Sequence, residues 1–377
     1  MGARALDSLL AKINVILITP HGRAGSVFFQ GLFDGHPEVA NLPYFFNEYY
    51  QFDNAKDLQE NITIFCKKNS LLFTAFSDYL IDGFEDKTRE KYFIENISVA
   101  EFSREMLVLL KSQAVTSKKF LLAVYYSFYK IKGKSFKDIK YLLVHLHHYD
   151  HTDYFRMHTK EHELLLRDFP DLYYFPFFRS DVRITVMSYW NEMKNFYIIF
   201  DYFVCLKNSY RAFSFFSKKV KNLKVIELEE LHARGALYMH ELCEKLSIGY
   251  SPVLEECTFN GHKWFGRSVN FIKSSTFNSD RAVSINKKWN FNMRGYSYNQ
   301  FVFYIFQNEC TEKICYRRLF SETIFYLIFY LRDSLSAFTS YQKVNGGLLE
   351  KLFFIPRLFF FQSRQAKKFI GFLVKGV

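Results

Sequence analysis

A short loop of glycine, arginine and serine residues has the composition of an anion-binding site. The loop, Pro20–Ser26 (PHGRAGS), lies between an apolar run, Asn14–Thr19 (NVILIT), and a segment, Ser26–Phe33, with the pattern of a short helix. The apolar run is rich in β-branched residues, as expected for a central strand of a parallel sheet. A loop between a strand and a helix presents backbone N–H groups to one point, where the helix dipole adds partial positive charge. The sequence therefore predicts an oxyanion site here.

Individual residues of this loop suit the same task. Gly22 and Gly25 let the backbone turn tightly and approach an anion closely. Arg23 supplies a fixed charge with forked donors, Ala24 adds a backbone N–H, and Ser26 supplies a hydroxyl at the first helical turn. The loop lacks both the Lys-Ser/Thr ending of the P-loop and the full GxGxxG pattern, which disfavours hydrolysis of a metal–nucleotide complex. An ordinary tight turn is the alternative interpretation.

A second basic residue follows another predicted strand. Arg179 comes directly after the apolar run Asp171–Phe178 (DLYYFPFF), and Ser180 or Asp181 then caps a predicted helix over residues 182–193. In α/β proteins, ligands bind at the carboxyl ends of the parallel strands. We therefore expect Arg179 and the glycine loop to converge on one ligand, although about 150 residues separate them.

Candidates for a general base follow a further apolar run. The predicted strand Lys140–Leu146 (KYLLVHL) leads into a histidine cluster that consists of His145, His147, His148 and His151. A neutral imidazole is suited to removing a proton near pH 7. His147 is the candidate for catalysis or substrate binding, whereas structural hydrogen bonding is the expected role of His145.

Strand and helix patterns alternate along the chain. Leu223–Leu228 predicts a fourth strand, and helical patterns cover most of residues 53–135, Thr159–Phe169 and Ala233–Leu246. This alternation indicates an α/β fold, a mainly parallel sheet with helices on both faces in three layers. Pro176, inside an apolar run, is expected near a strand end because proline cannot donate a hydrogen bond to a neighbouring strand.

The amino-acid composition of the chain changes towards its C-terminal part. We expect residues 1–295 to form the α/β domain and residues 296–377 to form a helical extension that is aromatic and basic. The extension has no stretch with the roughly 18 uninterrupted apolar residues that a spanning helix needs. A helical cap on the core and an interfacial membrane patch are the two interpretations.

The overall composition favours some partners and excludes others. The formal net charge of +12 suits a nucleotide, an acidic glycan or a membrane surface. Zinc-finger, basic-zipper and aromatic RNA-binding signatures are absent, so we expect no nucleic-acid partner. The six cysteines form no CxxC pair, which favours a reducing compartment and gives no metal site. No secretory signal precedes the first strand, so we expect a cytoplasmic protein, with membrane association through the extension.

The glycine loop resembles the signature of a known enzyme family. Pro20–Val39 (PHGRAGSVFFQGLFDGHPEV) resembles the 5′-phosphosulfate-binding motif PRSGTTLLxxLLxxHPxV of sulfotransferases that use 3′-phosphoadenosine 5′-phosphosulfate (PAPS). The matching residues are Gly22, Arg23, Gly25, Ser26, Leu32, His36, Pro37 and Val39. Val27 departs from the pattern, because the family usually has a second hydroxyl residue there.

Three later segments resemble further blocks of this family, in the usual order. Phe169–Asp171, followed by Arg179 and Ser188, is similar to FPxAKFIxxxRxPRDxxxSxY, with one residue more than the usual spacing. Val225–Leu231 is similar to a strand and its YEDL turn, and Thr258–Ser268 (TFNGHKWFGRS) is similar to the TFNGxxWxGxS loop. The resemblance thus extends over most of the predicted α/β domain.

This resemblance implies a P-loop-like sulfotransferase fold and the transfer of a sulfuryl group from PAPS to an acceptor hydroxyl or amine. The donor-binding residues that it implies are Gly22, Arg23, Ala24, Gly25, Ser26, Arg179, Ser188, Trp264 and Gly266. Arg23 would also act in catalysis by neutralising the leaving phosphate. Some members carry a catalytic glutamate near the position of Glu48, which therefore joins His147 as a candidate base, with a surface carboxylate as its alternative.

The acceptor implied is a glycan, a lipid-linked saccharide or a small hydroxylated metabolite. A hypothesis from a different class is a non-catalytic relative that binds a nucleotide or an anionic glycan at a membrane surface. Val27 and the irregular spacing between Arg179 and Ser188 motivate this second hypothesis.

Overall fold

The structure of the chain is a computed structural model that describes residues 9, 12–20, 25–43, 46, 49–73, 97–111, 114–146, 159–178, 213, 215–266 and 274–278. All of these residues belong to one compact unit of the chain. The predicted helix over 182–193 and the predicted extension 296–377 lie outside the described residues. Among the described helices, none is long and apolar enough to cross a bilayer.

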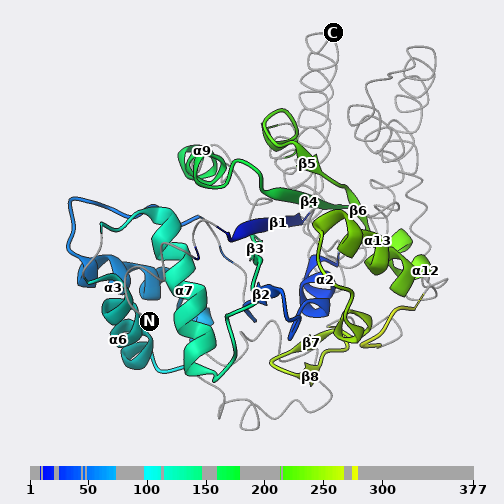
Figure 1. Cartoon of the computed structure of the whole chain (residues 1–377), viewed down its shortest axis with the longest axis horizontal. Coiled ribbons are helices and arrows are strands. Elements are labelled where there is room, and N and C mark those ends of the chain that lie inside the picture. The colour runs from blue at the N-terminus through cyan, green and yellow to red at the C-terminus, as the bar shows by residue number, and fades with distance from the viewer. Residues whose placement is uncertain are drawn as a thin grey trace, which may run out of the picture. The chain divides into compact units, whose positions relative to one another are not determined.

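A parallel sheet forms the centre of the described structure (Figure 1). Its central strand β1 (Asn14–Pro20) pairs in parallel with β3 (Tyr141–His145) on one side and β4 (Tyr173–Phe178) on the other. Beyond β3 lies β2 (Val39–Asn41), also parallel. The mainly parallel sheet predicted from the apolar runs is confirmed.

The fourth predicted strand is divided into two short strands along the outer edge of β4. These are β5 (Asn222–Leu223) and β6 (Ile226–Glu227), both parallel to β4. The carbonyl of Tyr174 accepts a hydrogen bond from the N–H of Lys224, so Pro176, two residues on, faces the same edge. It faces the break between the two strands, where its missing N–H is not needed. Pro176 is therefore tolerated inside β4, two residues before the strand ends at Phe178.

Helices cover both faces of the sheet (Figure 1). On one face, α2 (Ser26–Leu32), α12 (Leu228–Arg234) and α13 (Ala236–Leu246) share an apolar core with alternate residues of β1, β3 and β4. Successive strand residues point to opposite faces, and on the other face Val144 of β3 packs with residues of α7 (Ser117–Ile131).

Further helices complete this second layer. Helix α9 (Thr159–Asp168) packs beside α7, and α3 (Leu58–Lys68) and α6 (Val99–Leu110) pack outside it. The three-layer α/β fold is thus confirmed. The predicted helix Ala233–Leu246 differs in detail, because Gly235, at a φ of 50°, ends α12 and precedes α13.

His36 fastens the start of β2 to the segment that follows α13. Its Nε2 donates to the carbonyl of Gly249 over 3.0 Å, and its Nδ1 accepts from the N–H of Glu38. The ring is 2% exposed, and this burial lowers its pKa below the ordinary value, although the bond to Gly249 and the Glu38 carboxylate partly oppose the shift. His36 therefore has a structural role in this fold.

This arrangement predicts a pH-dependent stability. Because the pKa of His36 is lower in the folded chain, the unfolded chain binds the proton more readily once the pH falls below about 6.5. The contribution of His36 to stability is therefore present above that pH and declines as the pH falls towards the folded-state pKa. As the pH falls through this range, urea unfolding will show a smaller decrease in the free energy of unfolding for His36→Gln than for the wild type. His240→Gln, at an exposed site, is the control. If the free energy of unfolding of His36→Gln depends on pH as it does in the wild type, the prediction is contradicted.

Candidate functional site

The glycine loop leaves the carboxyl end of the central strand, as predicted. Residues 21–24, which include Gly22, Arg23 and Ala24, lie outside the described residues. The loop re-enters the described structure at Gly25, whose φ of 83° is in the left-handed region that favours glycine. Gly25 is the N-cap of α2, so the predicted succession of strand, loop and helix is confirmed.

Close packing surrounds Gly25. A Cβ atom at this position would lie 2.6 Å from two methyl carbons of Leu228, the first residue of α12. Ser26 begins α2 and is 3% exposed, and the first turn of the helix contains no acidic residue. The end of the helix that meets the loop therefore keeps the partial positive charge of its first N–H groups.

The predicted second basic site begins at the adjacent strand end. Arg179 and Ser188 lie outside the described residues, but β4 ends at Phe178, directly before Arg179. In the register of the sheet, Pro20 pairs with Phe177. The chain therefore leaves the sheet towards the glycine loop and towards Arg179 from two neighbouring strands at the same edge.

The predicted TFNGxxWxGxS segment begins as a tight hairpin. Strands β7 (Thr258–Phe259) and β8 (His262–Lys263) are antiparallel, and the turn residues Asn260 and Gly261 have φ of 51° and 82°. Positive φ at both central residues is typical of the Asn-Gly type I′ turn.

Two predicted donor-site residues follow this hairpin. Trp264 is 5% exposed, and its backbone N–H donates to the carbonyl of Cys257. Its ring meets the ring of Phe259 edge-on. Gly266 has a φ of 83°. The described contacts of Trp264 are thus with the core, and its role at a nucleotide remains a prediction.

The hairpin is attached to the end of α2 by a residue that the sequence patterns did not single out. The Oδ2 atom of Asp34 accepts hydrogen bonds from the Thr258 hydroxyl over 2.9 Å and from the Gly261 N–H over 2.7 Å. A signal was available, because an acidic residue just beyond the C-terminus of a helix is unfavourable to the helix dipole and requires another reason.

The two candidate bases follow one bridged pair of residues. Phe46 forms a parallel bridge with Leu146, and its N–H donates to the carbonyl of His145 over 2.7 Å. Glu48 and His147 lie outside the described residues. Along the chain, however, Glu48 is two residues after Phe46 and His147 is one residue after Leu146. The pairing therefore brings together two segments that are about 100 residues apart in sequence.

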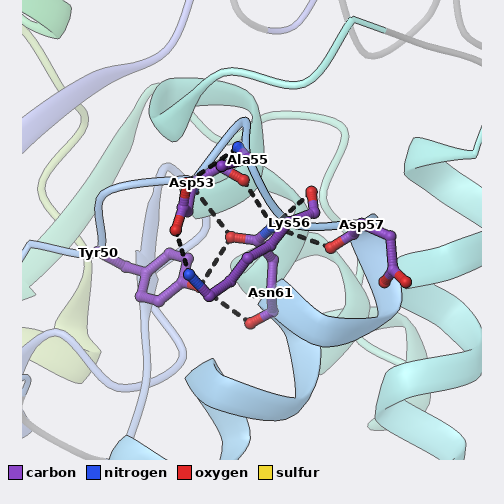
Figure 2. Close-up of polar contacts among 6 residues, drawn as sticks. All are labelled: Tyr50, Asp53, Ala55, Lys56, Asp57 and Asn61. Carbon is purple, nitrogen blue, oxygen red and sulfur yellow. Dashed lines mark hydrogen bonds and ion pairs between the residues drawn. The ribbon is translucent and has the colours of Figure 1, made fainter.

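The chain beyond Glu48 is held by a dense set of hydrogen bonds (Figure 2). The Oδ1 atom of Asn61 accepts from the Tyr50 hydroxyl and from the N–H of Asp53, at 3.0 and 2.9 Å. Its Nδ2 atom donates to the carbonyls of Asp53, Lys56 and Asp57. Asn61 is fully buried, so the turn that leads into α3 folds around one side chain.

Tyr49, directly before Tyr50, is held by a residue of α9. The hydroxyl of Tyr49 donates to the carboxylate of Asp168, at the end of α9, over 2.8 Å. Burial and this carboxylate raise the pKa of Tyr49 well above its ordinary value, so the phenol stays protonated. Phe46 and Tyr49 thus anchor the segment on both sides of Glu48.

His145 belongs to a buried polar network that joins β3 to α2. Its Nδ1 atom lies 2.7 Å from Oε1 of Gln30 in α2. The Nε2 atom of Gln30 donates to the carbonyl of Leu42 and to Oδ1 of Asn41, and the Asn41 amide donates to the carbonyl of Gln30. Backbone carbonyls can only accept, so they fix both amide orientations. His145 must then donate from Nδ1, as expected for a histidine in structural hydrogen bonding.

Within the described part of the chain, no group of three or more His, Cys, Asp or Glu side chains is placed to hold a metal ion. The described cysteines, Cys66, Cys243 and Cys257, are buried free thiols. Burial raises the pKa of Cys66 and of Cys243 to about 11, so both remain protonated at neutral pH.

The geometry at Gly25 predicts that a methyl group added there destabilises the fold more than a methyl group added at Gly35. Gly25→Ala will lower the free energy of unfolding by about 1–3 kcal/mol, through left-handed strain and contact with Leu228. Gly35→Ala is the matched control, because Gly35 has a φ of 77° but no atom within 4 Å of a Cβ. Urea unfolding of both variants measures the difference, and equal losses would contradict the close packing against Leu228.

The polar network predicts the protonation pattern of one imidazole. Nitrogen-15 NMR of the His145 ring, assigned with His145→Gln, will show a proton on Nδ1 at neutral pH. Gln30→Leu removes the acceptor and will release this preference. A proton on Nε2 alone in the wild type would refute the network as described.

No protein-family model and no curated protein matches the chain. Among solved structures, the chain is similar to the sulfotransferase domain from the curacin biosynthetic pathway, with 16% identity and a TM-score of 0.44 over 72% of this chain and 90% of that domain. It is also similar to the sulfotransferase domain from the Synechococcus PCC 7002 olefin synthase, with 13% identity and a TM-score of 0.44 over 78% of this chain and 95% of that one. The α/β class of the fold stands on the parallel strand pairing itself.

Proposed function

We propose that this chain is a sulfotransferase that moves a sulfuryl group from PAPS to a hydroxyl or amine of an acceptor. The observation that carries the proposal is the position of the glycine loop. The loop leaves the central parallel strand β1 and enters α2 through the left-handed Gly25, while the adjacent strand β4 ends directly before Arg179. Two groups with the chemistry to bind phosphate thus follow neighbouring strand ends, as a donor with a 5′-phosphosulfate and a 3′-phosphate requires.

The donor site in this proposal divides into two parts. Backbone N–H groups of residues 22–26, the guanidinium of Arg23 and the hydroxyl of Ser26 would bind the 5′-phosphosulfate. Arg179 and Ser188 would bind the 3′-phosphate, and the segment with Trp264 and Gly266 would close near the nucleotide. These roles rest on the resemblance of the sequence blocks, and the strand order supports them.

The departure of Val27 from the family pattern weakens the proposal less than the sequence alone suggests. The side chain of Val27 is 5% exposed and packs in the apolar core shared by α2, α12 and α13. At this position the fold buries a side chain in apolar surroundings, where a hydroxyl would need a partner. We therefore assign the side-chain hydroxyl contact to Ser26.

The reaction is an in-line displacement at sulfur. The acceptor oxygen or nitrogen forms a bond to sulfur as the bond from sulfur to the 5′-phosphate oxygen breaks, which leaves adenosine 3′,5′-bisphosphate. Arg23 and the loop N–H groups would stabilise the charge that develops on the leaving phosphate. Glu48 or His147 would take the acceptor proton, and the Phe46–Leu146 bridge brings both of their segments to this edge of the sheet.

For the acceptor, we propose a glycan, a lipid-linked saccharide or a small hydroxylated metabolite. Residues 296–377 would support this choice through peripheral contact with a membrane, since the extension is basic and aromatic. The second candidate function, binding without transfer, is favoured by the extra residue between Arg179 and Ser188.

Calorimetric titration with adenosine 3′,5′-bisphosphate tests the donor site. We expect the wild type to bind, and Arg23→Ala and Arg179→Ala each to weaken binding by about 10- to 100-fold, since a hydrogen bond to a charged group contributes about 1.5–3 kcal/mol. Arg104→Ala is the matched control, because it removes the same charge from an exposed position of α6. Absence of binding by the wild type would overturn the proposal.

Transfer of labelled sulfate from PAPS to pools of saccharide, lipid and small-molecule acceptors separates the two candidate functions. Transfer that is lost in Arg23→Ala and kept in Arg104→Ala supports the enzyme. Tight binding of the nucleotide without transfer to any acceptor pool would favour the non-catalytic relative.

A further inference from the structure

We propose that Asp34 is a positioning residue of the donor site, which joins the helix of the glycine loop to the hairpin that precedes Trp264 and Gly266. This inference rests on the proposed function. Asp34 is 7% exposed and lies two residues beyond Leu32, the last residue of α2. It therefore lies at the end of α2 opposite to Gly25.

Asp34 holds the hairpin at two points with one carboxylate oxygen. Its Oδ2 atom accepts from the side chain of Thr258, on β7, and from the backbone of Gly261, in the turn. A hydrogen bond to a charged group is about twice as strong as a neutral one, and a buried carboxylate depends on such partners. The first residue of β7 and the turn that follows the strand are thus fixed relative to α2.

A third element offsets the buried charge of Asp34. The ammonium of Lys134, in the connection between α7 and β3, lies 3.6 Å from the other carboxylate oxygen. Lys134 also lies over the ring of Tyr129, whose hydroxyl accepts from the N–H of Asn41 in β2. The carboxylate therefore connects the hairpin to α2 and, through Lys134, to the end of α7 on the opposite face of the sheet.

Helix α2 packs closely against the start of the hairpin. A Cβ atom at Gly31 would lie 2.3 Å from the Cys257 sulfur and 3.0 Å from the Thr258 carbonyl oxygen. The carbonyl of Cys257 in turn accepts from the N–H of Trp264. A shift of the hairpin would therefore displace the segment with Trp264 and Gly266 relative to the glycine loop.

This arrangement explains why a carboxylate occupies a place that is unfavourable for a helix. An acid beyond the C-terminus of α2 opposes the helix dipole, so the helix gains no stability from it. The benefit lies in the long-range contact, because Thr258 and Gly261 are more than 220 residues away in sequence. The role of Asp34 is to fix the distance between two parts of one donor site.

The test combines nucleotide binding with a probe of the hairpin itself. In Asp34→Ala we expect faster hydrogen exchange at the Gly261 N–H and about tenfold weaker binding of adenosine 3′,5′-bisphosphate by calorimetry. Asp34→Asn, which keeps one acceptor oxygen, will have an intermediate effect on both. Asp138→Ala, at an exposed turn, is the control and will change neither.

In the transfer assay, Asp34→Ala will raise the KM for PAPS more than it lowers kcat, since the residue positions the donor without contacting the reacting atoms. Thr258→Val tests the contact if Asp34→Ala fails to fold, because it removes one hydrogen bond and leaves the carboxylate in place.

The outcomes separate this inference from the proposed function. If Gly261 exchanges faster in Asp34→Ala or Thr258→Val while the nucleotide binds within twofold of the wild type, the positioning role is overturned and the proposed function stands. If the wild type itself does not bind the nucleotide, the proposed function fails, and the donor-site role of Asp34 fails with it.

Discussion

The parallel pairing of β1 with β3 on one side and β4 on the other is the constraint on which the proposed site depends. Because the three strands run in the same direction, the chain leaves them at one edge of the sheet. The glycine loop, the histidine segment and the segment that begins at Arg179 therefore start within a few strand spacings of one another. No local sequence pattern could bring them together without this order of strands.

Helix α2 connects the strand ends to the rest of the domain through its contacts. Its seven residues are all buried, and glycines at its start and near its end allow contact with Leu228 and Cys257. On the sheet side, Gln30 bonds to His145 and to the end of β2. The helix is thus held at both ends and along its length, which provides a rigid support for the loop that it follows.

Sequence patterns predicted β1, β3 and β4, because buried parallel strands appear as short apolar runs whose neighbours need not be known. The short strand β2 was not predicted. The patterns also placed Gly25 at the entry to α2, where a positive φ favours glycine. They assigned His145 to structural hydrogen bonding but missed its partner Gln30, 115 residues away, and they missed Asp34, whose partners lie up to 227 residues away. The split at Gly235 and the tolerance of Pro176 likewise depend on neighbouring segments, which a local pattern does not contain.

A crystal structure with adenosine 3′,5′-bisphosphate tests the central claim most directly. The account predicts the 5′-phosphate within about 3 Å of the Ser26 hydroxyl and of backbone N–H groups in the glycine loop, with the 3′-phosphate beside Arg179. A nucleotide bound at any other edge of the sheet, or a 5′-phosphate without contact to the glycine loop, would contradict it.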